Sequence, residues 1–102
     1  MVRESARTAD LVLTGELDVA NCARIAADVT RLCEQGHRWI RIDLGAVTFI
    51  DAATLGAFVE ARQCARAFGG EVVLASAHGL PMRLLQMFGL DAMLTDGRPS
   101  HG

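Results

Sequence analysis

The fold of this chain is decided by one stretch, Val47-Thr48-Phe49-Ile50-Asp51-Ala52-Ala53-Thr54-Leu55-Gly56. An apolar run ends at Asp51, and a helix-like pattern begins directly after it. An aspartate at such a junction is a good N-cap, because its carboxylate can accept hydrogen bonds from free N–H groups of the first helical turn. Open α/β sheets place ligand and partner sites where a helix begins at the carboxyl end of a strand. The stretch therefore predicts a strand, a capped helix and a candidate site between them.

The rest of the chain alternates between two hydrophobic periods. Apolar residues at every second position indicate strands, and apolar residues three and four positions apart indicate helices. Asp18 or Asn21 can cap the first helix, and Gly36 stands where that helix would end. The sequence leaves open whether residues 47–50 continue the preceding strand or form a tight turn after it. The expected order is a strand at 11–17, a helix at 21–35, a strand at 38–44, a helix at 52–68, a strand at 71–76, a helix at 80–88 and a last short strand at 92–94.

This alternation predicts an α/β fold with right-handed crossovers. We expect a mixed, mainly parallel sheet of about four or five strands, with about three or four helices. The length of 102 residues and a hydrophobic fraction of 51% suit one compact domain. Residues 1–10 are expected to form a polar lead-in that carries an edge strand, residues 11–95 the domain, and residues 96–102 a flexible tail.

Composition excludes several classes of function. The net charge is −2, which does not favour binding to nucleic acid or to an anionic membrane. Cys22, Cys33 and Cys64 are widely spaced and lack histidines at ligand spacing, so neither a metal site nor a disulfide framework is expected. No apolar run approaches the ~20 residues that span a bilayer. We expect a cytoplasmic protein without metal or cofactor.

Four short motifs stand in order along the chain: Gly15-Glu16-Leu17-Asp18, Ile42-Asp43-Leu44, Phe49-Ile50-Asp51-x-x-x-Leu55-Gly56, and Gly69-Gly70 before an apolar strand. Together they resemble the STAS domain of bacterial anti-sigma factor antagonists, over most of the chain. The resemblance implies a protein that binds an anti-sigma factor, itself an ATP-dependent serine kinase, and so frees a sigma factor. It also implies that the kinase ends this association by phosphorylating a serine directly after the acid at position 51.

The chain departs from that pattern at the phosphoacceptor. The usual Asp-Ser-Ser-Gly-Leu-Gly reads Asp51-Ala52-Ala53-Thr54-Leu55-Gly56. Ala52 has no hydroxyl, so phosphoryl transfer to it is chemically impossible. Thr54 is the alternative phosphosite, but two residues along a helix correspond to a rotation of roughly 200°. Its hydroxyl should therefore face away from position 52 and can bond back to Asp51.

These residues predict a binding module and not an enzyme, because no nucleophile, histidine or phosphate-binding glycine loop accompanies the acids. The simpler alternative is that Asp18 and Asp51 are only helix caps or turn residues. A rival function is that of the STAS subunit of an ABC-type lipid transporter, which binds the transporter ATPase and needs no phosphoserine. The residues expected to contact a partner are Asp18, Asn21, Asp51, Ala52, Ala53, Thr54, Leu55 and Gly56.

Overall fold

The computed structural model describes residues 1–95 of the chain. The flexible tail expected at 96–102 lies outside this range. The strands are β1 (Val2–Glu4), β2 (Thr8–Leu17), β3 (Trp39–Ile50), β4 (Glu71–Ala75) and β5 (Leu94–Thr95). The helices are α1 (Val19–Glu34), α2 (Ala52–Ala67) and α3 (Gly79–Met87), followed by the short 3-10 helix η1 (Asp91–Met93).

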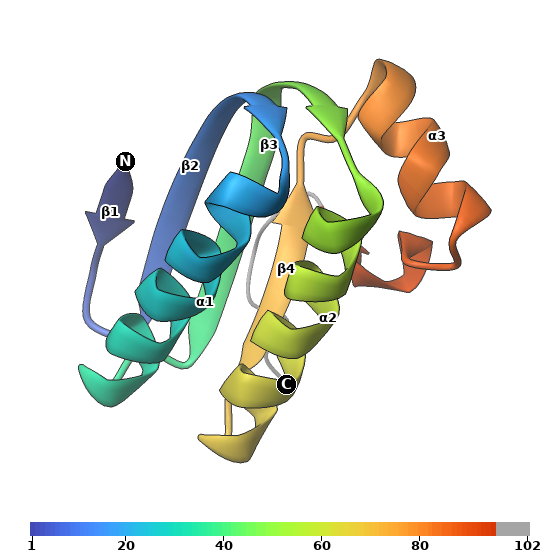
Figure 1. Cartoon of the computed structure of the whole chain (residues 1–102). Helices are drawn as coiled ribbons and strands as arrows, with labels where there is room; N and C mark the ends of the chain where they lie inside the picture. The colour runs from blue at the N-terminus through green and yellow to red at the C-terminus, as the bar shows by residue number, and fades with distance from the viewer. Residues whose placement is uncertain (96–102) are drawn as a thin grey trace.

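The strands form one five-stranded sheet in the order β1-β2-β3-β4-β5. Strands β2 to β5 pair in parallel, and β1 pairs antiparallel with β2 at the edge. Because each crossover steps to the next strand in the same direction, α1 and α2 cover the same face of the sheet (Figure 1). The predicted α/β class and the mixed, mainly parallel sheet are both confirmed.

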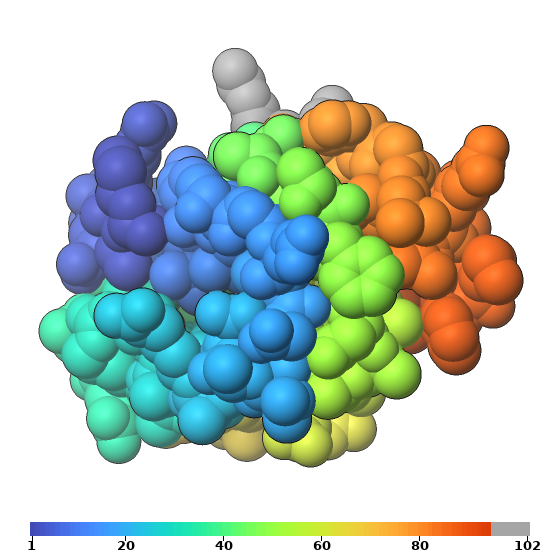
Figure 2. Space-filling view, turned by 45° about the horizontal axis from the view of Figure 1, so that its top comes forward, coloured from blue at the N-terminus to red at the C-terminus, as the bar shows by residue number. Residues whose placement is uncertain are grey.

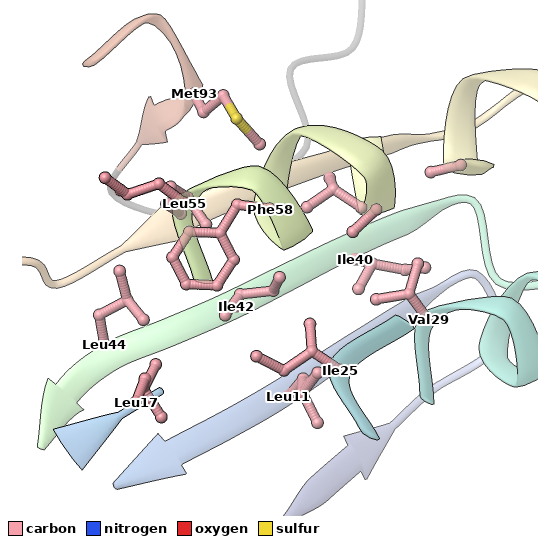
Figure 3. Close-up of a cluster of buried hydrophobic side chains, with 14 of the residues drawn as sticks. Leu11, Leu17, Ile25, Val29, Ile40, Ile42, Leu44, Leu55, Phe58 and Met93 are labelled. Carbon is pink, nitrogen blue, oxygen red and sulfur yellow. The ribbon is translucent and has the colours of Figure 1, made fainter. Parts of the chain in front are cut away.

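A hydrophobic core fills the space between the sheet and the helices (Figure 3). Alternate residues of β2 and β3 point into it, and Phe58 of α2 is fully buried at its centre. Burial of a side chain of this kind contributes roughly 1.5–3 kcal/mol. The largest fully buried side chains are Phe58, Leu11, Ile25, Leu32, Ile40, Ile42, Leu44, Ile50, Leu74, Leu85, Val29 and Val47.

Two strands are longer than the sequence indicated. Strand β2 begins at Thr8, because Thr8 and Ala9 already pair with the start of β3. Strand β3 continues through residues 45–50, so the question left open by the sequence is answered in favour of a continuous strand. Register shifts in the β2–β3 pairing absorb the irregularity, and Gly15 adopts a φ of +79° there. This continuity carries β3 to the position from which α2 starts.

The amino edge of the sheet, where the parallel strands begin, is held by close backbone packing and ion pairs. A Cβ on Gly70 would lie 2.5 Å from the Arg38 carbonyl oxygen, so only glycine fits there. The Glu71 carboxylate accepts hydrogen bonds from Arg62 at 3.2 Å and from Arg66 at 2.9 Å. Desolvation raises the pKa of Glu71, but Arg66, the Val72 N–H and Arg62 together lower it below its ordinary value.

Candidate docking site

The start of α1 is fixed by a capping box. Asp18 directly follows β2, and its Oδ1 accepts a hydrogen bond from the Ala20 N–H at 3.0 Å. The Asn21 Oδ1 in turn accepts from the Asp18 N–H at 2.9 Å. The two residues that the sequence offered as alternative caps therefore act together, and the helix begins at Val19, two residues before the expected start.

The start of α2 is fixed by Asp51 alone. Its Oδ1 accepts from both the N–H and the hydroxyl of Thr54, each at 2.8 Å. These two bonds, the N–H first and the hydroxyl second, lower the pKa of the Asp51 carboxyl below its ordinary value. Asp51 is therefore a carboxylate at neutral pH, at a helix N-terminus where negative charge is favourable.

The two helix starts lie side by side at the carboxyl edge of the sheet. The Asp51 N–H donates to the Leu17 carbonyl oxygen at 3.1 Å, which joins the ends of β2 and β3. Across the helices, the Cys22 Sγ lies 3.8 Å from the Thr54 Oγ1. The beginnings of α1 and α2 accordingly stand at the same end of the molecule in Figure 1. The topology thus brings Asp18 and Asp51 to one edge.

The expected contact residues divide into an outer and an inner set. Asp18, Ala52, Ala53 and Gly56 are exposed, and Asn21 and Asp51 are half-buried. The other two need a correction. Thr54 is 0% exposed and Leu55 is 5% exposed, because both lie on the face of α2 that packs on the core. Their side chains anchor the helix and are buried within the domain. The Thr54 hydroxyl is bonded to Asp51 and turned away from the surface that carries Ala52.

Sequence reasoning missed the apolar part of this edge. Val19 is 71% exposed, Phe49 is 40% exposed and Leu80 is 47% exposed. Figure 2 shows the segments that carry them, the start of α1, the end of β3 and the start of α3, exposed on one face. Val47 and Ile50 are three positions apart and so break the strict alternation of a strand. The apolar residue Phe49 between them was the signal in the sequence. We call Asp18, Val19, Phe49, Ala52, Ala53 and Gly56 the docking edge.

Gly56 is notable because the fold does not require it. It lies inside α2 at an exposed position, and a Cβ there would meet nothing within 4 Å. Glycine in a helix interior costs about 1 kcal/mol relative to alanine. A glycine that destabilises its own helix without an internal reason is typical of a surface that another backbone approaches closely.

Asp18 and Asp51 are both occupied as helix caps. Among residues 1–95, no three His, Cys, Asp or Glu side chains gather so as to hold a metal ion. A hollow of about 400 Å³ lies between β2 and α1, and its charged side chains are Arg24 and Asp28. Within the same described range, no helix is both long and apolar enough to cross a membrane.

The model of the STAS domain family matches residues 1–101. The chain belongs to the STAS domain family. This agrees with the resemblance found in the four sequence motifs. A search of curated proteins finds no significant match to this STAS domain.

Solved structures share the fold. The anti-sigma factor antagonist SpoIIAA in its unphosphorylated form has a TM-score of 0.84 at 20% identity, covering 96% of this chain and 87% of its own. An anti-sigma factor antagonist from Mycobacterium paratuberculosis has a TM-score of 0.78 at 17% identity, covering 92% of this chain and 80% of its own. A sulfate transporter family protein from Wolinella succinogenes has a TM-score of 0.76 at 17% identity, covering 88% of this chain and 77% of its own. At these identities the likeness shows the fold.

Proposed function

We propose that this STAS domain is an anti-sigma factor antagonist, a non-catalytic cytoplasmic protein that binds an anti-sigma factor and so frees a sigma factor. The observation that carries the proposal is the docking edge, where two capped helix starts present exposed small and apolar side chains together. Exposed apolar side chains that gather on one face are typical of protein–protein contacts. The partner is expected to be an anti-sigma factor of the ATP-dependent serine kinase type.

The proposal includes a specific mode of control. Ala52 is exposed directly after Asp51 but carries no hydroxyl, and the Thr54 hydroxyl is buried. A phosphate adds about −1.5 to −2 charges, which beside Asp51 would oppose docking by repulsion and desolvation. Without an acceptor for it, the domain is either permanently competent to bind or controlled by its abundance or by a further partner.

The binding surface is tested with an aspartate in place of the missing phosphate. Ala52→Asp should weaken the binding of the anti-sigma factor that co-purifies with the protein by ~10-fold or more, measured by isothermal titration calorimetry. Because an acid in the first turn of a helix is favourable, the variant should fold normally. Ala67→Asp is the matched control, since Ala67 is exposed at the other end of α2. Equal affinities of wild type and Ala52→Asp would show that the contact lies elsewhere.

The mode of control is tested with the same kinase and ATP. The wild-type protein should take up no phosphate within residues 51–56, as measured by intact mass and peptide mapping. Ala52→Ser restores an exposed hydroxyl at the acceptor position and should be phosphorylated stoichiometrically. Phosphate on Thr54 of the wild type would overturn this part of the proposal while leaving the docking edge in place.

The second candidate is the STAS subunit of an ABC-type lipid transporter, which would bind the transporter ATPase. The absent hydroxyl at Ala52 favours it, because that role requires no phosphorylation. A tagged copy expressed in the native cytoplasm separates the two functions. Co-purification of an anti-sigma kinase supports the first, and co-purification of a transporter ATPase supports the second.

A further inference from the structure

Two cysteines from different helices meet near the amino edge of the sheet. Cys33 is buried near the end of α1, and Cys64 is half-buried near the end of α2. Thr30 stands three residues before Cys33 and therefore on the same face of α1. Its Oγ1 lies 3.6 Å from the Cys64 Sγ. Burial raises the pKa of the Cys33 thiol, and the neighbouring Cys64 raises it further.

Cys33 and Cys64 lie where α1 packs on α2, and this packing brings the two side chains near each other. It is the most extensive helix–helix contact among the described elements. Two small residues of α2 close to Cys64 in the sequence, Ala61 and Ala65, are also buried. Small side chains let two helices approach closely, and a disulfide requires Cα atoms about 4.4–6.8 Å apart.

We propose that Cys33 and Cys64 form a reversible disulfide when the protein meets a peroxide. The more exposed Cys64 reacts first. Its thiol loses a proton, the thiolate sulfur attacks an oxygen of hydrogen peroxide, the O–O bond breaks, and the departing hydroxide takes up that proton, which leaves a sulfenic acid and one water. The Cys33 sulfur then attacks the Cys64 sulfur, the S–O bond breaks, and the departing hydroxide takes the Cys33 thiol proton and leaves as a second water. Two thiols are oxidised and one peroxide is reduced to two waters. A dithiol reductant restores both thiols.

Two alternatives to a Cys33–Cys64 disulfide, a zinc site and a disulfide with Cys22, are disfavoured. A structural zinc site needs four ligands, and in the described part of the chain no third His, Cys, Asp or Glu joins the two sulfurs. Cys22 is remote, because a separation of eleven positions from Cys33 corresponds to about 16 Å along α1. Its Sγ is instead 3.5 Å from the Asp18 carbonyl oxygen, at the docking edge. Cys22 therefore serves as an internal control.

The disulfide is detected by peptide mapping of the whole reduced chain after treatment with hydrogen peroxide. Remaining thiols are alkylated and the protein is digested with trypsin, which places Cys33 in Leu32–Arg38 and Cys64 in Gln63–Arg66. We expect these two peptides joined, with Cys22 alkylated, and their separation by dithiothreitol. Sulfinic acid on Cys64 with Cys33 alkylated, or dimers joined through Cys22 as the main product, would overturn the proposal.

Variants give a second, independent measurement. Cys22→Ser should still form the cross-link, and Cys64→Ser should not. Oxidised Cys22→Ser should melt on the order of 10 °C above its reduced form, because a cross-link of this loop length restricts the unfolded chain. Peroxide should leave the melting midpoint of Cys64→Ser unchanged. A cross-linked protein that melts below its reduced form would contradict the geometry inferred here. The inference does not depend on the proposed function.

Discussion

At the carboxyl edge of the sheet, Asp18 and Asp51 use their carboxylates to cap α1 and α2, whereas at the amino edge Glu71 and Glu4 hold separate elements together. Glu71 binds two arginines of α2, and Glu4 lies 2.9 Å from the Nε2 of the buried His37. Among the described residues, none of the docking edge forms an ion pair.

The same contrast appears in the glycines of the two edges. Gly70 is required by the fold, because any Cβ would meet the backbone of Arg38, whereas a Cβ on Gly56 has open space around it. The amino edge is thus built to fasten the domain, and the carboxyl edge keeps small side chains where the fold alone would accept larger ones. On the proposed function, partner binding takes place at the carboxyl edge, at the opposite end of the molecule from these fastening contacts.

The largest expected effect is on Gly70. Gly70→Ala should lower the free energy of unfolding by about 3 kcal/mol, because the new Cβ must displace the backbone between α2 and β4. Urea unfolding followed by circular dichroism measures the change. Gly69→Ala is the control: Gly69 has a φ of +82° but open space, so it should lose only about 1–2 kcal/mol. Equal losses would show that close backbone contact is unimportant at this edge.

A smaller loss is expected from Thr54→Val. It removes a buried hydroxyl that donates to Asp51 and should cost about 1.5 kcal/mol. The pKa of the Asp51 carboxyl should move up toward its ordinary value, as measured by NMR titration of its carboxyl carbon. A carboxylate with a lowered pKa in the folded protein contributes stability above its unfolded pKa, and that contribution is lost as the pH falls through the folded pKa. The variant should therefore lose less stability on acidification than the wild type.

Thr30→Val is the matched control for Thr54→Val, since the Thr30 hydroxyl lies beside Cys64 and far from Asp51, toward the other end of the helices. It should leave the pKa of Asp51 unchanged. A similar shift in both variants would mean that the Thr54 hydroxyl is not its cause.

Gly56→Ala should act in the opposite direction. The free energy of unfolding should rise by about 0.5–1 kcal/mol, because alanine favours the helix and its Cβ meets no neighbour. Under the proposed function, the added methyl group should also weaken partner binding. Unfolding in urea and titration with the partner are measured on the same sample. A gain of stability with unchanged affinity would separate Gly56 from the contact surface.

The smallest effect is expected from Glu71→Gln. Its ion pairs with Arg62 and Arg66 are partly exposed, so their loss should cost at most about 0.5–1 kcal/mol at low salt and less at high salt. Because the pKa of Glu71 is lowered, the difference from the wild type should disappear as the pH falls through the folded pKa of Glu71. Glu60→Gln is an exposed control on α2, the helix that carries Arg62 and Arg66. A salt-independent loss would indicate a packing effect instead.

Much of the fold could be predicted from local patterns, because strands and helices with strong periodicity form where their apolar faces require. The position of Asp18 and Asp51 on one edge followed from the parallel topology, before any coordinates. The exact strand ends did not follow, because Thr8 and residues 45–50 are ordered by pairing with a neighbouring strand. Pairing of this kind depends on residues distant in the sequence.

The candidate site was predicted in outline and not in the direction of each side chain. The rotation along α2 correctly turned Thr54 toward Asp51, but Thr54 and Leu55 were also counted as contact residues although both are buried. Phe49 is exposed because it directly precedes the buried Ile50 and so points to the opposite face of β3. The proximity of Cys33 and Cys64 depends on how two helices pack, which their spacing in the sequence does not reveal.

Ala52 has one further consequence. Its backbone already belongs to a capped helix start and its side chain is exposed, so a serine there would need no rearrangement of the protein. Alanine and serine codons can differ by a single base. On the proposed function, a point mutation is all that separates a domain that is always available to its partner from one that an enzyme can turn off.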